Sequence, residues 1–150
     1  MPYSTDADLF DRLDERTVRR LTDDDGTGNV NTLVVEAARA TAEEIIHAWI
    51  RSAYTDLPIT PAPPLLVAAE VDIIAWRLYR RRASEEVPTS IRQSYEDAVA
   101  TLKRIGKGEM RLGVDADGDG EEDSAAPTIG LRVRGREITD LEAYGDLGDP

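Results

Sequence analysis

Apolar residues recur three to five positions apart along much of the first 107 residues, the spacing of one face of an α-helix. The longest such stretch, residues 33–54, contains neither glycine nor proline and follows Thr32, which is expected to cap it. Its predicted apolar face consists of Leu33, Ala37, Ala40, Ile45, Trp49 and Ala53. The four prolines within residues 58–64 predict a stiff, extended connection after this helix, because proline lacks an amide and clashes with the preceding turn.

A second long helix is predicted over residues 65–83, with Pro64 in its first turn. Its expected core face holds Leu65, Ala69, Ile73, Trp76 and Tyr79, widened by Leu66, Ile74 and Leu78. With Val67 and Val71 added, apolar side chains cover more than one face, which predicts contacts with other copies of the chain. Four arginines close the helix, at positions 77, 80, 81 and 82. They could pair with Glu85 and Glu86 or bind a partner's acidic surface.

A third amphipathic helix is predicted to follow and to stop at Gly106 and Gly108. Its stripe consists of Ile91, Tyr95, Ala98, Val99, Leu102 and Ile105. Two short helices near residues 5–14 and 15–21 should precede the long ones, with Ser4 or Thr5 as the first cap. The predicted fold is therefore all-α: a small bundle of two long antiparallel helices, a third C-terminal helix and short N-terminal helices.

Charge divides the chain into two parts. Residues 1–107 hold 18 acids and 14 bases, whereas residues 108–150 hold 12 acids and 4 bases. We therefore expect a helical domain over 1–107 and an acidic, largely irregular extension over 108–150, in which only 128–139 alternates well enough for a β-hairpin. The net charge of −12 argues against nonspecific nucleic-acid binding. No apolar run is long enough to predict a membrane span, and the absence of cysteine is compatible with synthesis in the reducing cytoplasm of a cell.

Two aspartate-rich loops resemble the start of a calcium loop. Asp23 and Asp25 begin one over residues 23–34, and Asp115, Asp117 and Asp119 begin another over 115–126. Both lack the bidentate glutamate that an EF-hand needs at position 12. The sequence favours a helix-to-helix turn for the first and a solvated acidic linker for the second. A calcium-binding interaction module remains the alternative.

Candidate catalytic groups are few. Glu43, Glu44, Glu70 and Asp72 could form a carboxylate cluster on facing helices, and Glu44 with His47 matches the Glu-x-x-His pattern of di-iron bundles once. A small helical enzyme would be built on Glu44, His47, Glu70 and Asp72. A lone histidine without a paired nucleophile makes no catalytic constellation. The sequence therefore predicts a protein that is not an enzyme and has no cofactor.

The order of motifs resembles a family of small proteins from Mu-like phages and prophages, long described only as a domain of unknown function. The resemblance spans about residues 6–113 and omits 114–150. It lies in Leu21–Asp25, Leu57–Pro58, Pro64–Leu65, Asp72–Ile73, Arg80–Arg82 and Tyr95–Ala98. Trp49 and Trp76 depart from it, standing where smaller or tyrosine-like residues are usual.

The resemblance implies a head–tail connector, or adaptor, of the virion. Such proteins form a ring, commonly of twelve subunits, beneath the portal protein and extend the channel through which DNA passes. The implied partners are other copies of the chain, the portal and a stopper or tail-terminator protein. The predicted partner interface is the end of the second long helix: Trp76, Arg77, Tyr79, Arg80, Arg81 and Arg82.

Overall fold

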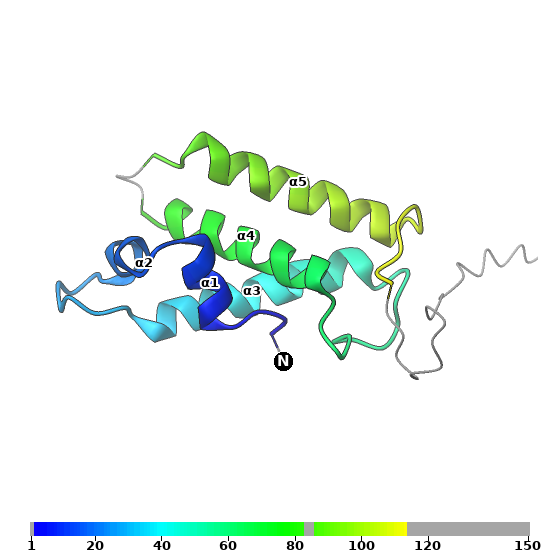
Figure 1. Ribbon diagram of the computed structural model, residues 1–150, viewed down its shortest axis with the longest axis horizontal. Helices are drawn as coiled ribbons and strands as arrows, with labels where there is room; N and C mark the ends of the chain where they lie inside the picture. Colours follow the sequence, from blue (N-terminus) through cyan, green and yellow to red (C-terminus); the bar gives the residue numbers. More distant parts are fainter. Residues whose placement is uncertain (1, 83–85, 114–150) are drawn as a thin grey trace, which may run out of the picture.

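The computed structural model describes residues 2–82 and 86–113, and these fold into five helices. They are α1 (Asp6–Arg12), α2 (Glu15–Thr22), α3 (Thr32–Ile50), α4 (Pro64–Arg80) and α5 (Thr89–Gly106). The three long helices lie side by side, and α4 runs back along α3 before α5 returns beside it (Figure 1). The predicted all-α class is confirmed. The predicted hairpin at 128–139 lies outside the described residues.

Helices α1, α2 and α3 each begin at a residue whose side chain accepts from an exposed amide of the first turn, whereas α4 and α5 follow Pro63 and Pro88 without a side-chain cap. Thr5 caps α1 in a reciprocal capping box with Asp8, and Asp14 caps α2 by accepting from the Thr17 amide. Asn31, rather than the predicted Thr32, caps α3. The predicted cap was one residue late. Asparagine is also a favoured capping residue, and the Asn31 side chain accepts from the Val34 amide three positions on.

Helix α4 forms the centre of the core. It packs against α3, α5, α1 and α2, and nine of its seventeen residues are buried. The sequence predicted that the additional apolar residues of this helix would contact other copies of the chain. Most of them are instead buried by the other helices of the same chain. Val71 and Tyr79 are buried, and Leu65 alone among the large apolar residues of α4 is classed as exposed, at 38%.

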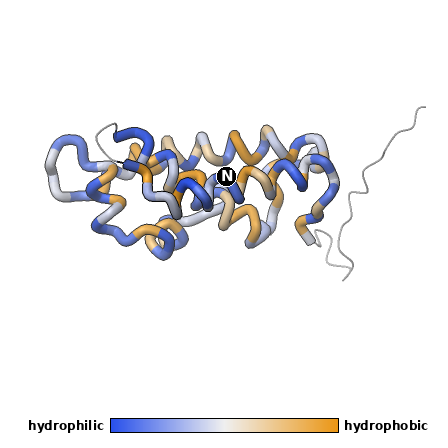
Figure 2. Tube along the Cα trace, turned by 90° about the horizontal axis from the view of Figure 1, so that it is seen from above, coloured by the Kyte–Doolittle hydropathy of each residue, from blue (hydrophilic) through white to orange (hydrophobic). Residues whose placement is uncertain are grey.

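Helix α3 turns a different face inward than predicted. Its buried residues are Val35, Ala38, Ala42, Ile46 and Ile50. Of the predicted stripe, Leu33 is 73% exposed, Ala37 and Ala40 are exposed, and Trp49 is 39% exposed. Apolar positions recur around the helix rather than on one side, so two stripes satisfied the same period and the wrong one was chosen. Figure 2 shows hydrophobic and hydrophilic positions interspersed along the helices of the fold.

The C-terminal end of α5 approaches α3 closely. A Cβ atom at Gly106 would lie 2.2 Å from the Trp49 carbonyl oxygen, and Ser52 Oγ donates to the Gly106 carbonyl over 2.7 Å. The Leu112 amide donates to Tyr54 Oη over 3.1 Å. Gly106 thus permits helix packing as well as ending α5. No helix in the described residues is long and apolar enough to cross a membrane.

Candidate partner interface

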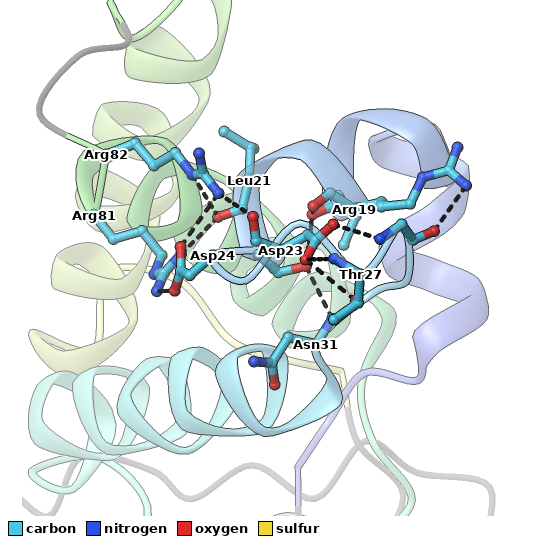
Figure 3. Close-up of polar contacts among 11 residues, drawn as sticks. Arg19, Leu21, Asp23, Asp24, Thr27, Asn31, Arg81 and Arg82 are labelled. Carbon is cyan, nitrogen blue, oxygen red and sulfur yellow. Dashed lines mark hydrogen bonds and ion pairs between the residues drawn. The ribbon is translucent and has the colours of Figure 1, made fainter.

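Two arginines at the end of α4 form hydrogen bonds and ion pairs with the end of α2 and the loop that follows it (Figure 3). Arg81 Nη1 donates to the Leu21 carbonyl over 2.8 Å, and the guanidinium forms a bidentate ion pair with Asp24. Arg82 Nη2 donates to the Asp23 carbonyl over 2.6 Å and to Asp24 Oδ1 over 3.2 Å. The hydrogen bond from Arg81 lowers the pKa of Asp24 and raises that of Arg81. We name this contact the arginine clamp.

The clamp is a contact that neither alternative drawn from the sequence included. The sequence allowed Arg81 and Arg82 either to pair with Glu85 and Glu86 or to bind a partner, and in the described part of the chain they bind residues far away in sequence. The carbonyls at the end of α2 need donors, and a guanidinium supplies several in one plane. Glu85 lies outside the described residues.

The aspartate-rich loop over residues 23–30 folds around its own amides. Asp23 accepts from the amides of Gly28 (2.7 Å) and Thr27 (2.8 Å), and these bonds lower the pKa of Asp23. Gly26 and Gly28 take positive φ angles of 70° and 78°, which glycine adopts without strain. These contacts give the loop the local form of a turn.

The metal candidates remain predictions. Asp25 is exposed, and Asp115, Asp117 and Asp119 lie outside the described residues. Within residues 2–82 and 86–113, no three His, Asp or Glu side chains are grouped so that they could hold a metal ion. Calcium titration by calorimetry would test the alternative directly, with a heat of binding as the result that supports it.

The aromatic part of the predicted interface joins two helices of the same chain. Trp76 on α4 stacks on Tyr95 of α5 with ring centroids 4.1 Å apart and planes 6° from parallel. Arg80 lies over the Trp76 ring, 4.9 Å from its centroid. Tyr79 is buried and Arg77 is half-buried, which leaves Arg80 and Arg81 as the exposed members of the predicted interface.

Beside the clamp is a basic surface hollow of about 800 Å³ that sequence analysis missed. Its charged lining consists of Arg16, Arg19, Arg20, Arg82, Asp14 and Asp23, and we name it the basic hollow. Three of the arginines come from α2, where spacings of three and four residues place them on one side. That spacing was the available signal. The arginines that end the second long helix form a longer run in the sequence and are therefore the more obvious basic cluster.

A second feature, an apolar groove with acids at its edge, lies between α1 and the start of α4. Its volume is about 510 Å³, and Val67, Ala68 and Val71 form part of its apolar wall. The acidic edge carries Asp8, Asp11 and Asp72. Asp72 accepts from Arg12 Nε over 2.8 Å, so its charge is partly compensated.

The predicted catalytic candidates lie in different surroundings. Glu70 is fully buried and accepts from the Ser4 amide over 2.5 Å, and burial raises its pKa. His47 Nε2 is hydrogen-bonded to Tyr3 Oη over 3.0 Å, Asp72 is paired with Arg12, and Glu44 is exposed. His47 and Glu70 thus hold the N-terminal segment against α3 and α4. Glu44 and Asp72 take no part in that contact, so the four residues do not form one cluster.

Comparison with known families gives a match over most of the chain. The model of the family described as "Bacteriophage Mu, Gp36" matches residues 3–130. The match covers all five helices and continues beyond residue 113, where the resemblance seen in the sequence ended. Residues 114–130 therefore have a counterpart in that family, contrary to expectation. No curated protein matches the chain.

Proposed function

Since the chain belongs to the Bacteriophage Mu Gp36 family, which makes it a protein of Mu-like phages, we propose that it is a structural protein of the virion, a head–tail connector. In this role the chain forms a ring of identical subunits on the portal protein. The ring extends the channel for DNA and passes it on to a stopper or tail-terminator protein. The observation that carries the proposal is the family match over residues 3–130, together with the motifs quoted above.

The charge of the protein is compatible with a channel that does not retain DNA. The chain has a net charge of −12, so on balance it repels phosphate. A lining that bound the duplex tightly would slow its passage. The proposed role is therefore one of shape and assembly, without a catalytic step.

Two surface features of opposite charge lie at separate places on the chain, as the contacts between neighbours in a ring require. In a ring, each subunit presents one surface to the neighbour on one side and a different surface to the other. The basic hollow lies on α2, whereas the apolar groove with its acidic edge lies beside the start of α4. Two complementary surfaces on one chain support a heterologous, head-to-tail contact between copies.

Electron cryo-microscopy of the protein mixed with the portal of its own phage tests this function. We expect a ring of added density beneath the portal, into which the five-helix fold can be placed. The matched control is the portal without the protein. A portal that gains no density, together with virion necks that lack this fold, would reject the proposed role.

A further inference from the structure

The apolar groove beside the start of α4 leaves apolar side chains uncovered within the described part of the chain. Its volume is about 510 Å³, and in its wall Pro64 and Ala68 are exposed while Val67 is half-buried. Such side chains gain free energy when a second apolar surface removes them from water. The groove is therefore suited to bury apolar side chains of another segment.

Two acids at the edge of the groove form no ion pair in the part of the chain that the structure describes. Asp8 accepts from the Thr5 amide over 2.7 Å and from the Thr5 hydroxyl over 2.6 Å, and both donors are neutral. Arg39, the cation nearest to Asp8, is paired with Asp6. Asp11 is exposed. A segment that carries both apolar and basic side chains is therefore the chemistry that the groove fits.

A segment of this kind lies in the sequence beyond residue 113. Residues 129–136 read IGLRVRGR and contain no acid, and their arginines are three of the four bases in residues 108–150. Apolar residues at 129, 131 and 133 alternate with arginines at 132 and 134. In an extended backbone alternate side chains point to opposite faces, so the apolar ones can face the groove together. Arginine has a long stem that can lie along apolar surface while its charge reaches an acid at the edge. We call residues 129–136 the basic segment.

The length of the groove suits a short extended segment. The step from Pro64 to Val71 along the groove rises about 10 Å at 1.5 Å per residue of α4. Residues 129–133 cover about 13 Å when extended at 3.3 Å per residue. The three apolar side chains of the basic segment therefore match the stretch of α4 that lines the groove.

The basic segment can reach the groove of its own chain. The described residues end at Gly113, and the amide of Leu112 beside it donates to Tyr54 Oη over 3.1 Å. Tyr54 precedes Ala62, which lines the groove, by eight positions, so at most about 28 Å separates them. Leu131 follows Gly113 by 18 positions, a length that can span about 60 Å. Figure 1 shows the end of α5 and the connection between α3 and α4 at the same end of the fold.

We propose that the basic segment docks in the apolar groove of its own chain, with its apolar side chains along α4 and its arginines at Asp8 and Asp11. The chain holds the segment near this groove at an effective concentration of about a millimolar, which exceeds that of free copies at micromolar concentration. Residues 131–136 lie beyond the family match, so the contact is a feature of this chain. It does not depend on the connector role, although a neighbouring copy that used the groove would have to displace the segment.

Peptide competition tests whether the basic segment occupies the groove. A fluorescent peptide of residues 127–138 is titrated at about 0.15 M salt into the full wild-type chain and into the segment variant, Arg132→Glu with Arg134→Glu. We expect the segment variant to bind the peptide at least about tenfold more tightly, because in the wild type the tethered segment competes. The matched control, Arg92→Glu with Arg104→Glu at exposed positions of α5, should bind within about threefold of the wild type. Equal binding to wild type and segment variant, or binding to neither, overturns the inference.

A change at the edge of the groove tests where the peptide binds. In the segment variant, Asp11→Arg reverses an edge charge, and Glu96→Arg makes the same change at an exposed position of α5. We expect Asp11→Arg to weaken binding at least about tenfold and Glu96→Arg less than about threefold, because distant charges are screened. A peptide of the same composition with its arginines side by side should bind at least about tenfold more weakly. Equal binding of the two peptides would mean that charge alone attracts them and would overturn docking in the groove.

Paramagnetic relaxation in the intact chain separates docking in the same chain from docking in a second copy. The chain has no cysteine, so Thr128→Cys takes a single nitroxide label. We expect the label to broaden the methyl signals of Val67 and Val71 in its own chain, and reduction of the nitroxide to restore them. In a mixture of nitroxide-labelled chains with isotope-labelled chains that lack the nitroxide, we expect these signals to stay sharp. Broadening that is as strong in the mixture would assign the segment to a second copy and overturn the inference, as would a lack of broadening in both samples.

Discussion

Helices α3 and α4 are both rich in apolar residues, yet the bundle uses them differently. Helix α4 lies between α1, α2, α3 and α5, and most of its apolar residues are buried inside the chain. Helix α3 lies at the edge, buries one stripe and leaves Leu33, Ala37 and Ala40 exposed. The difference shows that the place of a helix in the bundle, more than its composition, decides how much apolar surface remains for a partner.

The largest effect should come from shortening a buried side chain of α4. Leu78→Ala removes a side chain that is 0% exposed, and we expect the free energy of unfolding to fall by about 2–5 kcal/mol. Leu65→Ala is the matched control on the same helix, where the side chain is 38% exposed and we expect a loss of about 1 kcal/mol or less. Denaturant unfolding monitored by circular dichroism measures both. Equal losses would show that α4 is not enclosed as described.

The next effect concerns the point where α5 meets the end of α3. Gly106→Ala places a Cβ atom where the Trp49 carbonyl oxygen lies, so we expect a loss of about 1–3 kcal/mol despite the higher helix propensity of alanine. Ala100→Gly, at an exposed position of α5, is the control for propensity and should cost about 1 kcal/mol. Thermal or denaturant unfolding gives the comparison. A stabilised Gly106→Ala protein would contradict the close approach.

The pH dependence of the free energy of unfolding tests whether Glu70 of α4 is buried in the bundle. Burial raises its pKa above the ordinary value of 4.5, so the folded protein favours the protonated carboxyl. The stabilising contribution of that proton is complete below pH 4.5 and is lost as the pH rises through the raised pKa. Glu70→Gln keeps an oxygen that can accept the Ser4 amide and has no charge to bury. We expect it to exceed the wild type in stability by about 1 kcal/mol at neutral pH.

The measurement for Glu70 is the free energy of unfolding at several pH values from about 4 to 8, the range over which a raised carboxyl pKa takes effect. The difference between Glu70→Gln and the wild type should grow as the pH rises. Glu44→Gln, at an exposed position of α3, should show no such trend. The lowered pKa values of Asp23 and Asp24 act in the opposite direction, at the acid end, and are common to all three proteins. If the difference in the free energy of unfolding stayed constant across this pH range, Glu70 would not have the raised pKa that burial predicts.

Much of this fold could be predicted from the sequence, because the responsible signals are local. Thr5 with Asp8, Pro64 and Gly106 mark helix ends through groups within a few residues of one another. The stripe of α5 was also correct, since polar residues such as Arg92 and Glu96 separate its faces clearly. Helix α3 lacks such separation, and the buried stripe through Ala42 and Ile46 could be recognised only once its neighbours were in place.

The contacts of the arginines could not be predicted, because they join residues about sixty positions apart. Arg81 and Arg82 have acids near them in sequence, and that proximity suggested Glu85 and Glu86. The fold instead brings the unsatisfied carbonyls of Leu21 and Asp23 to them. The basic hollow depends equally on tertiary structure, since Arg82 joins the α2 arginines only when α4 packs against α2.

The smallest expected effect is on the outer face of α3, where Leu33→Ala should change the free energy of unfolding by less than about 0.5 kcal/mol. Val35→Ala, two positions along and on the buried face, removes fewer carbon atoms and should cost about 2 kcal/mol, because Val35 is only 4% exposed. Denaturant unfolding of both variants measures directly which face of α3 is buried. A larger loss for Leu33→Ala than for Val35→Ala would mean that α3 turns its other stripe to the core, and the contrast between the two helices would then disappear.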